Sequence, residues 1–251
     1  MSGFWNQAFD LSGRCAVITG GAAGIGLACA NLLVERGARV ALLDRDPAVV
    51  DVAASLGAGH LGIAVDLSRI GEVQHTIDQV VERFQRLDYL INSAGVVLLD
   101  KAVDVSESAW DTTLDINLKA SFFVAQACAR HMLAQGRGRI VNLASQAAVI
   151  GLDRHVAYCA SKAAIVGMTK VLAMEWAPHI SVNAISPTIV ETALGKKAWA
   201  GEVGEQAKLQ IPAGRFAQPE EIAGLALYLL SDAAQMITGA NMVIDGGYSI
   251  Q

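Results

Sequence analysis

Short runs of apolar and β-branched residues alternate with longer helical patterns along the chain, and this alternation constrains the fold more than any other feature. Several runs, such as residues 40–43, are apolar at every position, as in strands covered on both faces. Strands that alternate with helices predict βαβ units and a parallel sheet. We expect strands at residues 16–19, 39–43, 62–65, 89–92, 139–143, 181–185 and 242–244, and helices near 25–36, 47–56, 70–85, 107–135, 155–177 and 219–230.

The predicted fold class is α/β: a Rossmann-type doubly wound parallel sheet of about seven strands, flanked by helices. We expect a single domain over residues 1–251, because no linker, composition shift or internal repeat divides the chain. Residues 189–212 connect the sixth strand to the last helix with more residues than a connection needs. Long connections are usually functional or mobile, so we expect a lid over the site, with a surface helical excursion as the alternative.

Charge and cysteine usage narrow the possible functions. The formal net charge is −5 and no basic stripe is present, which disfavours nucleic-acid binding. The four cysteines are scattered, without a C-x-x-C pair or a nearby histidine cluster, so we expect neither disulfides nor a metal site. The N-terminal residues do not resemble a signal peptide, and no stretch looks long enough to span a bilayer, so we expect a cytoplasmic protein that binds no membrane.

A glycine-rich turn, TGGAAGIG at residues 19–26, connects the first predicted strand to an apolar helix. Glycines in such a turn let the backbone approach a pyrophosphate, and the helix N-terminus supplies N–H donors. The same glycines can also serve a tight turn and close helix–strand packing. The residues of the turn that we expect to bind a dinucleotide are Gly20, Ala23, Gly24, Ile25 and Gly26.

Asp44 ends the second predicted strand, where a carboxylate can accept hydrogen bonds from both ribose hydroxyls of adenosine. Because this carboxylate would repel a 2′-phosphate, we expect NAD as the cofactor and NADP to be disfavoured. The neighbouring Arg45 complicates this preference, since a cation can accommodate a phosphate. Asp66, with Leu67 beside it, closes the third strand; it either reaches the adenine edge or caps the following helix.

These features continue along the chain as an ordered series of further motifs: NSAG at residues 92–95, Asn117, Ser145, YCASK at 158–162 and NAISP at 183–187. In this combination the chain resembles the short-chain dehydrogenase/reductase superfamily over nearly its full length, and within it NAD-dependent polyol and sugar-alcohol dehydrogenases. Two positions depart from the usual pattern: Ser93 replaces a common asparagine and Thr188 a common glycine.

The resemblance implies specific roles for individual residues. Ser145, Tyr158 and Lys162 match the catalytic trio of the superfamily, and Asn117 matches its accessory asparagine. Tyr158 and Lys162 also belong to the expected cofactor site. The remaining matched positions are Asn92, Ala94 and Gly95 beside the cofactor ribose, and Pro187, Val190 and Thr192 at its nicotinamide end.

The residue types suit the oxidation of an alcohol. Tyr158 and Lys162 are four residues apart on a predicted helix, so they project from the same face. An unperturbed tyrosine has a pKa of about 10, and a nearby ammonium group favours the phenolate. Ser145, at a strand end, is placed to stabilise alkoxide charge, and Asn117 can hold a water that connects Lys162 to solvent. Taken singly, each is an ordinary structural residue; the joint pattern indicates an oxidoreductase.

The substrate is less constrained than the reaction. We expect a polyol or small hydroxy-ketone, with a 3-oxoacyl-[acyl-carrier-protein] reductase as the alternative. The positions that resemble carrier-docking arginines are Gly136 and Met174, which are uncharged, although Arg130 and Arg137 are close in the chain. A non-catalytic nucleotide-binding regulator is a third hypothesis, against which the chain retains both tyrosine and lysine. Other candidate substrate contacts are Gln146, Arg154, His155 and Trp199.

We expect a homotetramer, or else a homodimer, chiefly because relatives commonly assemble in this way. The predicted helices at 107–135 and 155–177 add to this, since their apolar residues occupy more than one face. Helices of this kind are either deeply buried or packed against another subunit. The residues concerned are Ala120, Phe122, Phe123, Ala127, Val166, Thr169, Leu172 and Trp176, and the tail at residues 248–251 is a further candidate contact.

Overall fold

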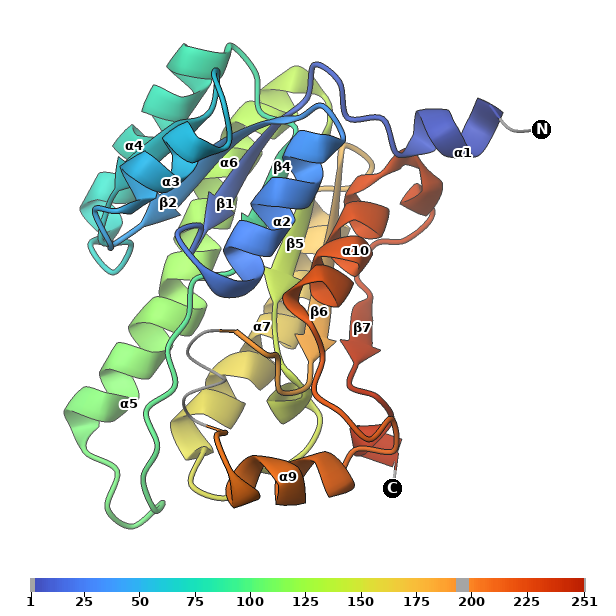
Figure 1. Cartoon of the computed structure of the whole chain (residues 1–251). Coiled ribbons are helices and arrows are strands. Elements are labelled where there is room, and N and C mark those ends of the chain that lie inside the picture. The colour runs from blue at the N-terminus through green and yellow to red at the C-terminus, as the bar shows by residue number, and fades with distance from the viewer. Residues whose placement is uncertain (1–2, 193–198, 251) are drawn as a thin grey trace.

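The protein folds around one parallel sheet of seven strands in the order β3-β2-β1-β4-β5-β6-β7 (Figure 1). The structure, a computed structural model, describes residues 3–192 and 199–250. The chain enters in the middle of the sheet and winds outward first on one side and then on the other, which confirms the predicted fold class. The strands are β1 (Cys15–Thr19), β2 (Arg39–Asp44), β3 (Leu61–Ala64), β4 (Tyr89–Asn92), β5 (Gly138–Leu143), β6 (Ile180–Pro187) and β7 (Asn241–Ile244).

Helices cover both faces of the sheet. The helices α2, α3 and α10 pack on one face and α4, α6 and α7 on the other. The α-helices are α1 (Gly3–Ala8), α2 (Gly24–Glu35), α3 (Val49–Ser55), α4 (Ile70–Phe84), α5 (Glu107–Leu114), α6 (Ser121–Gln135), α7 (Val156–Glu175), α9 (Glu202–Leu209) and α10 (Pro219–Leu230). Shorter helical segments are η1 (Asp115–Ala120), η2 (Gln146–Ala148), η3 (Asp232–Ala234) and η4 (Tyr248–Ile250).

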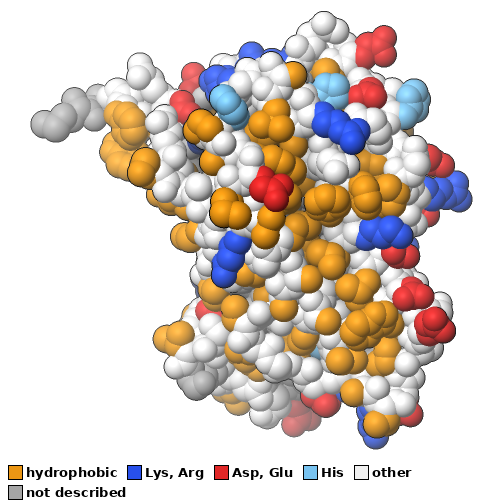
Figure 2. Space-filling model, turned by 180° about the vertical axis from the view of Figure 1, so that it is seen from behind, with side chains coloured by type: hydrophobic (Ala, Val, Ile, Leu, Met, Phe, Trp, Pro, Cys, Tyr) orange, Lys and Arg blue, Asp and Glu red, His pale blue; other side chains and the backbone are white. Residues whose placement is uncertain are grey.

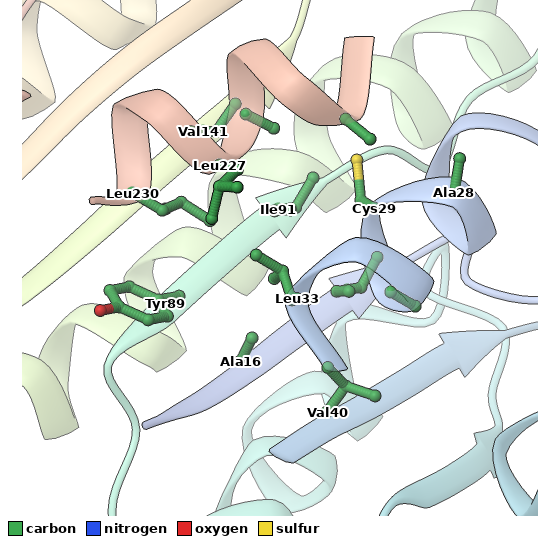
Figure 3. Packing of buried hydrophobic residues seen from close by; sticks show 14 of the residues in the cluster. Ala16, Ala28, Cys29, Leu33, Val40, Tyr89, Ile91, Val141, Leu227 and Leu230 are labelled. Carbon is green, nitrogen blue, oxygen red and sulfur yellow. The ribbon is translucent and has the colours of Figure 1, made fainter. Parts of the chain in front are cut away.

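Two apolar clusters hold the layers together, one on each face of the sheet. In the first, Leu33 of α2 and Leu227 of α10 pack over Ala16 and Ile91 of the central strands (Figure 3). In the second, α4, α6 and α7 pack over the alternate residues of the same strands. Every residue of β1 is buried, because a central strand of a doubly covered sheet has no solvent-facing side.

The predicted strands and helices are all present, with one interruption that the sequence did not predict. The helix expected at residues 107–135 is divided by η1, a π-helical segment that contains Asn117. Segments of this kind are rare and occur frequently at functional sites. The short helix α1 was also not predicted, whereas α9 lies in the connection for which a surface helical excursion was the alternative.

The predicted lid falls in the connection between β6 and α10. Its described part contains α9, while residues 193–198 lie outside the described residues. Trp199 packs against Phe216, with ring centroids 6.0 Å apart. The lid therefore stays a prediction.

Helix α7 contradicts the expectation that no stretch is long enough to cross a bilayer. It has 20 residues and a mean hydropathy of 1.3, which is sufficient by length and composition. In the structure this helix packs against β6 and the sheet, and it carries the buried Lys162. Its apolar character therefore matches a covering layer of the sheet.

The apolar residues that suggested a subunit interface divide into two groups. Ala120, Ala127, Thr169 and Leu172 are buried within this chain, so burial alone accounts for them. Phe122, Val166 and Trp176 are partly buried against the apolar clusters, and the partly buried Phe123 packs on Phe122 with ring centroids 5.1 Å apart. None of these residues is among the exposed large apolar residues of the chain. Figure 2, the view from behind, shows other hydrophobic side chains along the middle of the molecule.

Candidate active site

The glycine-rich turn between β1 and α2 lies at the carboxyl edge of the sheet. Gly20 and Gly24 adopt positive φ angles of 65° and 57°, which favour glycine. A Cβ on Gly26 would lie 2.2 Å from the carbonyl oxygen of Gly20, so only glycine permits this close packing of α2 on the turn. Gly26 therefore shapes the turn, and the preceding backbone faces the cleft.

Asp44, the last residue of β2, is tied to the same turn. Its carboxylate accepts a hydrogen bond from the backbone N–H of Ala22 at 3.1 Å and another from that of Asp46 at 3.1 Å. A carboxylate has about four acceptor positions, so two remain for the hydroxyls of a ribose. The exposed Arg45 follows it at the rim of the cleft.

A cleft of about 420 Å³ extends from Asp44 to Thr192 along the carboxyl ends of β1 to β4. Most of the predicted cofactor-binding residues line it. These are Gly20, Ala23, Gly24, Ile25, Asp44, Arg45, Asp66, Leu67, Ala94, Gly95 and Thr192. Close backbone, a helix N-terminus and a carboxylate that faces a ribose are what a dinucleotide needs, so these residues fit NAD.

Asp66 belongs to this cleft and does not cap the following helix. Its carboxylate accepts hydrogen bonds from the backbone N–H and the hydroxyl of Ser68, at 3.0 and 2.7 Å, whereas Arg69 occupies the N-cap of α4. The helix-cap interpretation is therefore wrong. The contact with adenine stays a prediction.

Other predicted cofactor residues do not line the cleft. Asn92 is buried beneath it, where its side-chain N–H groups donate to the Ser121 carbonyl at 3.0 Å and to Asn142 Oδ1 at 2.9 Å. Val190 packs in the first apolar cluster and pairs with Ala217. Pro187 ends β6 and is buried.

The cleft includes six residues that sequence reasoning missed. Leu43 and Val65 directly precede the predicted acidic residues Asp44 and Asp66, and Ser68 lies two residues after Asp66. Ser93 and Val96 flank the predicted Ala94 and Gly95, while Ile116 comes from the π-helical segment. Their apolar or small side chains carry no signal of their own. Only their proximity to predicted positions could have indicated them.

Ser145, Tyr158 and Lys162 meet at the carboxyl end of β5. Ser145 follows this strand and caps η2, and its hydroxyl interacts with that of Tyr158. The Lys162 ammonium lies 5.7 Å from the centroid of the Tyr158 ring, and it donates a hydrogen bond of 2.7 Å to the Leu143 carbonyl. The helical spacing of the tyrosine and the lysine therefore places them together, as expected.

Burial changes the protonation of both side chains. It raises the pKa of the Tyr158 phenol, and the hydrogen bond from Ser145 opposes this shift. It lowers the pKa of the Lys162 ammonium to about 8. The sequence indicates only the attraction between ammonium and phenolate, whereas the larger cost of removing both from water depends on the tertiary structure.

Asn117 does not point freely toward the cleft. Its Oδ1 accepts from the Val96 N–H at 2.8 Å, and its Nδ2 donates to the Val96 carbonyl at 3.0 Å and to the Ser161 hydroxyl at 3.1 Å. A Cβ on Gly95 would lie 3.2 Å from Asn117 Oδ1 and 3.6 Å from Lys162 Nζ. Asn117 therefore fixes the loop after β4 directly beside Lys162.

The comparisons with known proteins agree with this geometry. The protein family described as Enoyl-(Acyl carrier protein) reductase matches residues 20–249. The chain is 55% identical over 249 residues to the NAD-dependent glycerol dehydrogenase of Listeria innocua, which covers 98% of each chain. It is 50% identical to the D-threitol dehydrogenase of Mycolicibacterium smegmatis, over 97% of this chain and 95% of the relative.

A solved structure supports the same relationship. A short-chain type dehydrogenase/reductase from Mycobacterium marinum superposes with a TM-score of 0.92 at 37% identity, over 98% of this chain and 99% of that one. The similarity thus extends over the whole sheet and both layers of helices.

Proposed function

The chain belongs to the short-chain dehydrogenase/reductase superfamily, and we propose that it is an NAD-dependent dehydrogenase that oxidises a secondary hydroxyl of a polyol. One observation carries this proposal. Ser145, Tyr158 and Lys162 meet at the same sheet edge as a cleft that fits NAD. The relatives at 55% and 50% identity, a glycerol and a threitol dehydrogenase, support a polyol as substrate.

In the proposed reaction Tyr158 is the base. Its phenolate accepts the proton of the substrate hydroxyl, while Ser145 donates a hydrogen bond to the same oxygen. NAD, when bound, supplies the acceptor for the hydride that leaves the substrate carbon. The interaction between the two hydroxyls supports the proposal that both reach one substrate oxygen.

Lys162 and Asn117 have supporting roles in this proposal. The Lys162 ammonium favours the Tyr158 phenolate, and it is held by the Leu143 carbonyl at 2.7 Å. Asn117 positions the loop at Gly95, against which Lys162 packs. Because the side chain of Asn117 is already bonded to Val96 and Ser161, we assign it this positioning role in place of holding a water.

The preference for NAD rests on Asp44. Its carboxylate accepts hydrogen bonds on both oxygens and lies at the rim of the cleft, where a 2′-phosphate would meet its negative charge. Arg45 is more exposed and belongs to the same rim, so it weakens this preference without reversing it. NAD is therefore the proposed cofactor and NADP the poorer one.

A polyol needs polar groups beyond the reacting oxygen. Gln146 follows Ser145 directly, is 4% exposed, and its Oε1 has no hydrogen-bond partner within residues 3–192 and 199–250. The His155 ring lies 6.0 Å from that of Tyr158. We propose that these two side chains contact neighbouring hydroxyls of the substrate.

The test is an assay of NADH formation across polyols of three to six carbons, with NADP measured in parallel. We expect at least one polyol, such as glycerol or threitol, to be oxidised with NAD at a higher kcat/KM than with NADP. Reduction of a 3-oxoacyl thioester without any polyol oxidation would favour the acyl-carrier alternative. Absence of turnover with every substrate, despite NAD binding, would favour a regulator.

We also propose that the protein is cytoplasmic and assembles as a homotetramer, or failing that a homodimer. The support is an exposed apolar strip along α7, where Val156, Val171 and Met174 are 40%, 47% and 74% exposed. Trp110 of α5 is 40% exposed. Exposed apolar groups of this extent favour burial against a second copy. Sedimentation as a monomer at micromolar concentration would contradict the assembly.

A further inference from the structure

A second cavity lies at the edge of the sheet opposite the cleft, where β4, β5 and β6 begin. Its volume is about 360 Å³. It is lined by Asp88, Tyr89, Gly136, Arg137, Gly138, Arg139, Pro178, His179, Ser181 and Gln235. Arg139 and Ser145 are six residues apart along β5, which corresponds to about 20 Å at the rise of a strand. A ligand in this cavity therefore does not overlap the dinucleotide cleft.

Three neighbouring strands place polar side chains at one level of this cavity. The register pairs Tyr89 with Arg139 and Arg139 with Ser181, so the three side chains share one face of the sheet. The Tyr89 ring packs in the first apolar cluster and its hydroxyl points away from that cluster (Figure 3). In the part of the chain that the structure describes, no hydrogen bond is formed by the Tyr89 or the Ser181 hydroxyl.

Arg139 carries an N–H group that needs an acceptor. Its Nη2 is 2.8 Å from Asp232 Oδ1, but Nη1 is buried and has no partner among the described residues. Buried donors in native proteins are nearly always bonded, and an unbonded one is costly. Burial lowers the pKa of the Arg139 guanidinium, and Asp232 opposes this shift. The positive charge of the Arg139 guanidinium is thus only partly compensated by Asp232.

The surroundings carry more positive than negative charge. Asp88 is 1% exposed and has three guanidinium groups near its Oδ1: Arg14 at 3.3 Å, Arg86 at 2.6 Å and Arg137 at 3.8 Å. With the pair of Arg139 and Asp232, four arginines face two carboxylates, which leaves a net charge of 4 − 2 = +2. This local excess stands out in a chain with a net charge of −5.

We propose that this cavity binds a phosphate group, either free phosphate or that of a small phosphomonoester. The planar guanidinium of Arg139 matches the geometry of a phosphate, and Arg137 adds a second cation. The hydroxyls of Tyr89 and Ser181 are further donors at the same level. The lining itself carries an excess of positive charge, with Arg137 and Arg139 against Asp88, which favours an anion.

The experiment titrates inorganic phosphate into the full-length protein calorimetrically, at an ionic strength held constant with sodium chloride. The protein is saturated with NAD, because the glycine-rich turn is a second phosphate site that NAD fills. We expect saturable binding of one phosphate per chain. A parallel titration with methyl phosphate distinguishes the two sources: tighter binding than phosphate indicates a phosphomonoester, and weaker binding indicates the free ion.

The variants Arg139→Gln and Arg137→Gln test the assignment. Because a charge-assisted hydrogen bond to the phosphate is lost, we expect Arg139→Gln to weaken phosphate binding by about tenfold or more. Arg137 is 46% exposed, so its replacement keeps the test informative if Arg139→Gln does not fold. The control is Arg130→Gln, which removes the same charge from an arginine bonded to Gln74 on the surface.

Three outcomes would overturn the proposal. The first is the absence of saturable phosphate binding to the NAD-saturated protein. The second is unchanged affinity in both cavity variants. The third is an equal loss in Arg130→Gln, which would indicate a general effect of net charge. If NAD does not bind, the same titration uses Gly26→Ala, which distorts the glycine-rich turn, in place of NAD saturation. Failure of the proposed NAD-dependent function is then distinguishable from failure of phosphate binding in the cavity.

Discussion

In the half of the site built by β1, β2 and β3, backbone N–H groups and accessible carboxylates face the cleft. In the half built by β4, β5 and β6, polar side chains are buried and hydrogen-bonded within the chain. Asp66 lies at the surface of the first half. In the second half Asn92, Asn142 and Lys162 are 3%, 0% and 5% exposed.

This difference separates recognition from chemistry. Accessible carboxylates in the first half interact with a ligand at small cost to the fold, so a substitution there changes selectivity. Buried polar groups in the second half are costly unless they are bonded, so each depends on its neighbours. A substitution in the second half is therefore expected to affect activity and stability together, except where it removes only the reacting atom.

The largest expected effect comes from removing that atom. We expect Tyr158→Phe to lower kcat by about 10³-fold, because general acid–base catalysis typically contributes about 10²- to 10⁴-fold. The Kd for NAD should change by less than about threefold, under 1 kcal/mol. Steady-state kinetics and NAD titration measure the two quantities. Cys159→Ser, next in the chain, is the matched control and should keep its activity.

Near-wild-type turnover in Tyr158→Phe would remove the tyrosine from the mechanism. It would also contradict the assignment of chemistry to the second half, which would then hold no acid–base group. Equal loss of NAD binding and of turnover would instead assign Tyr158 to the binding site.

The second effect concerns the buried amide chain of the second half. Asn142 accepts from Asn92 at 2.9 Å and donates to the Thr169 hydroxyl at 3.0 Å. We expect Asn142→Leu to lower the free energy of unfolding by about 2 kcal/mol, because both partners lose a buried hydrogen bond. The surface substitution Asp66→Asn in the first half should change it by less than about 0.5 kcal/mol. Urea unfolding measures both, and equal losses would contradict the distinction between the halves.

The third effect sharpens the role of the first half. We expect Asp44→Ala to lower kcat/KM with NAD by about 10-fold to 100-fold, which corresponds to about 1.4 to 2.8 kcal/mol. Activity with NADP should rise, since the repelling carboxylate is gone and Arg45 remains. Asp46→Ala, two residues further along at the surface, is the control. Loss of activity with both cofactors would assign Asp44 to bracing the turn through Ala22.

A fourth effect is a pH dependence of stability from Lys162. Its pKa is about 8 in the folded protein against an ordinary value of 10.5, so the unfolded chain binds more protons between these pH values. The contribution of Lys162 to stability therefore rises with pH in this window, by at most about 1.4 kcal/mol per pH unit. Below pH 8 the charged, buried lysine destabilises the fold.

The measurement is the difference in unfolding free energy between wild type and Lys162→Met from pH 7 to 10.5. This difference should shift in favour of wild type as the pH rises. Cys29, Cys128 and Tyr89, whose pKa values are raised by burial, add an opposite slope, but it is common to both proteins and cancels. Lys170→Met, at the surface of the same helix, should show no such shift. A flat difference for Lys162→Met would mean that the lysine is not desolvated.

Much of the site was predictable because its residues are fixed by local rules. Strand ends place Asp44 and Ser145 at one edge of a parallel sheet, and a spacing of four places Lys162 beside Tyr158 on a helix. Asn92 was predicted beside the cofactor and lies beneath the cleft, because its partners come from distant segments. The π-helical turn at Asn117 has no sequence signal that distinguishes it from the helices on either side.

The order of strands and helices, the glycine-rich turn and most of the residues that line the cleft follow from the sequence, because periodicity and spacing act over a few residues. Which polar groups are buried, and how burial shifts their pKa values, depends on the tertiary structure. It alone brought Arg14, Arg86 and Arg137 around one carboxylate at the far edge of the sheet. Desolvation and charge pairing depend on contacts between segments far apart in the chain, and no local pattern encodes them.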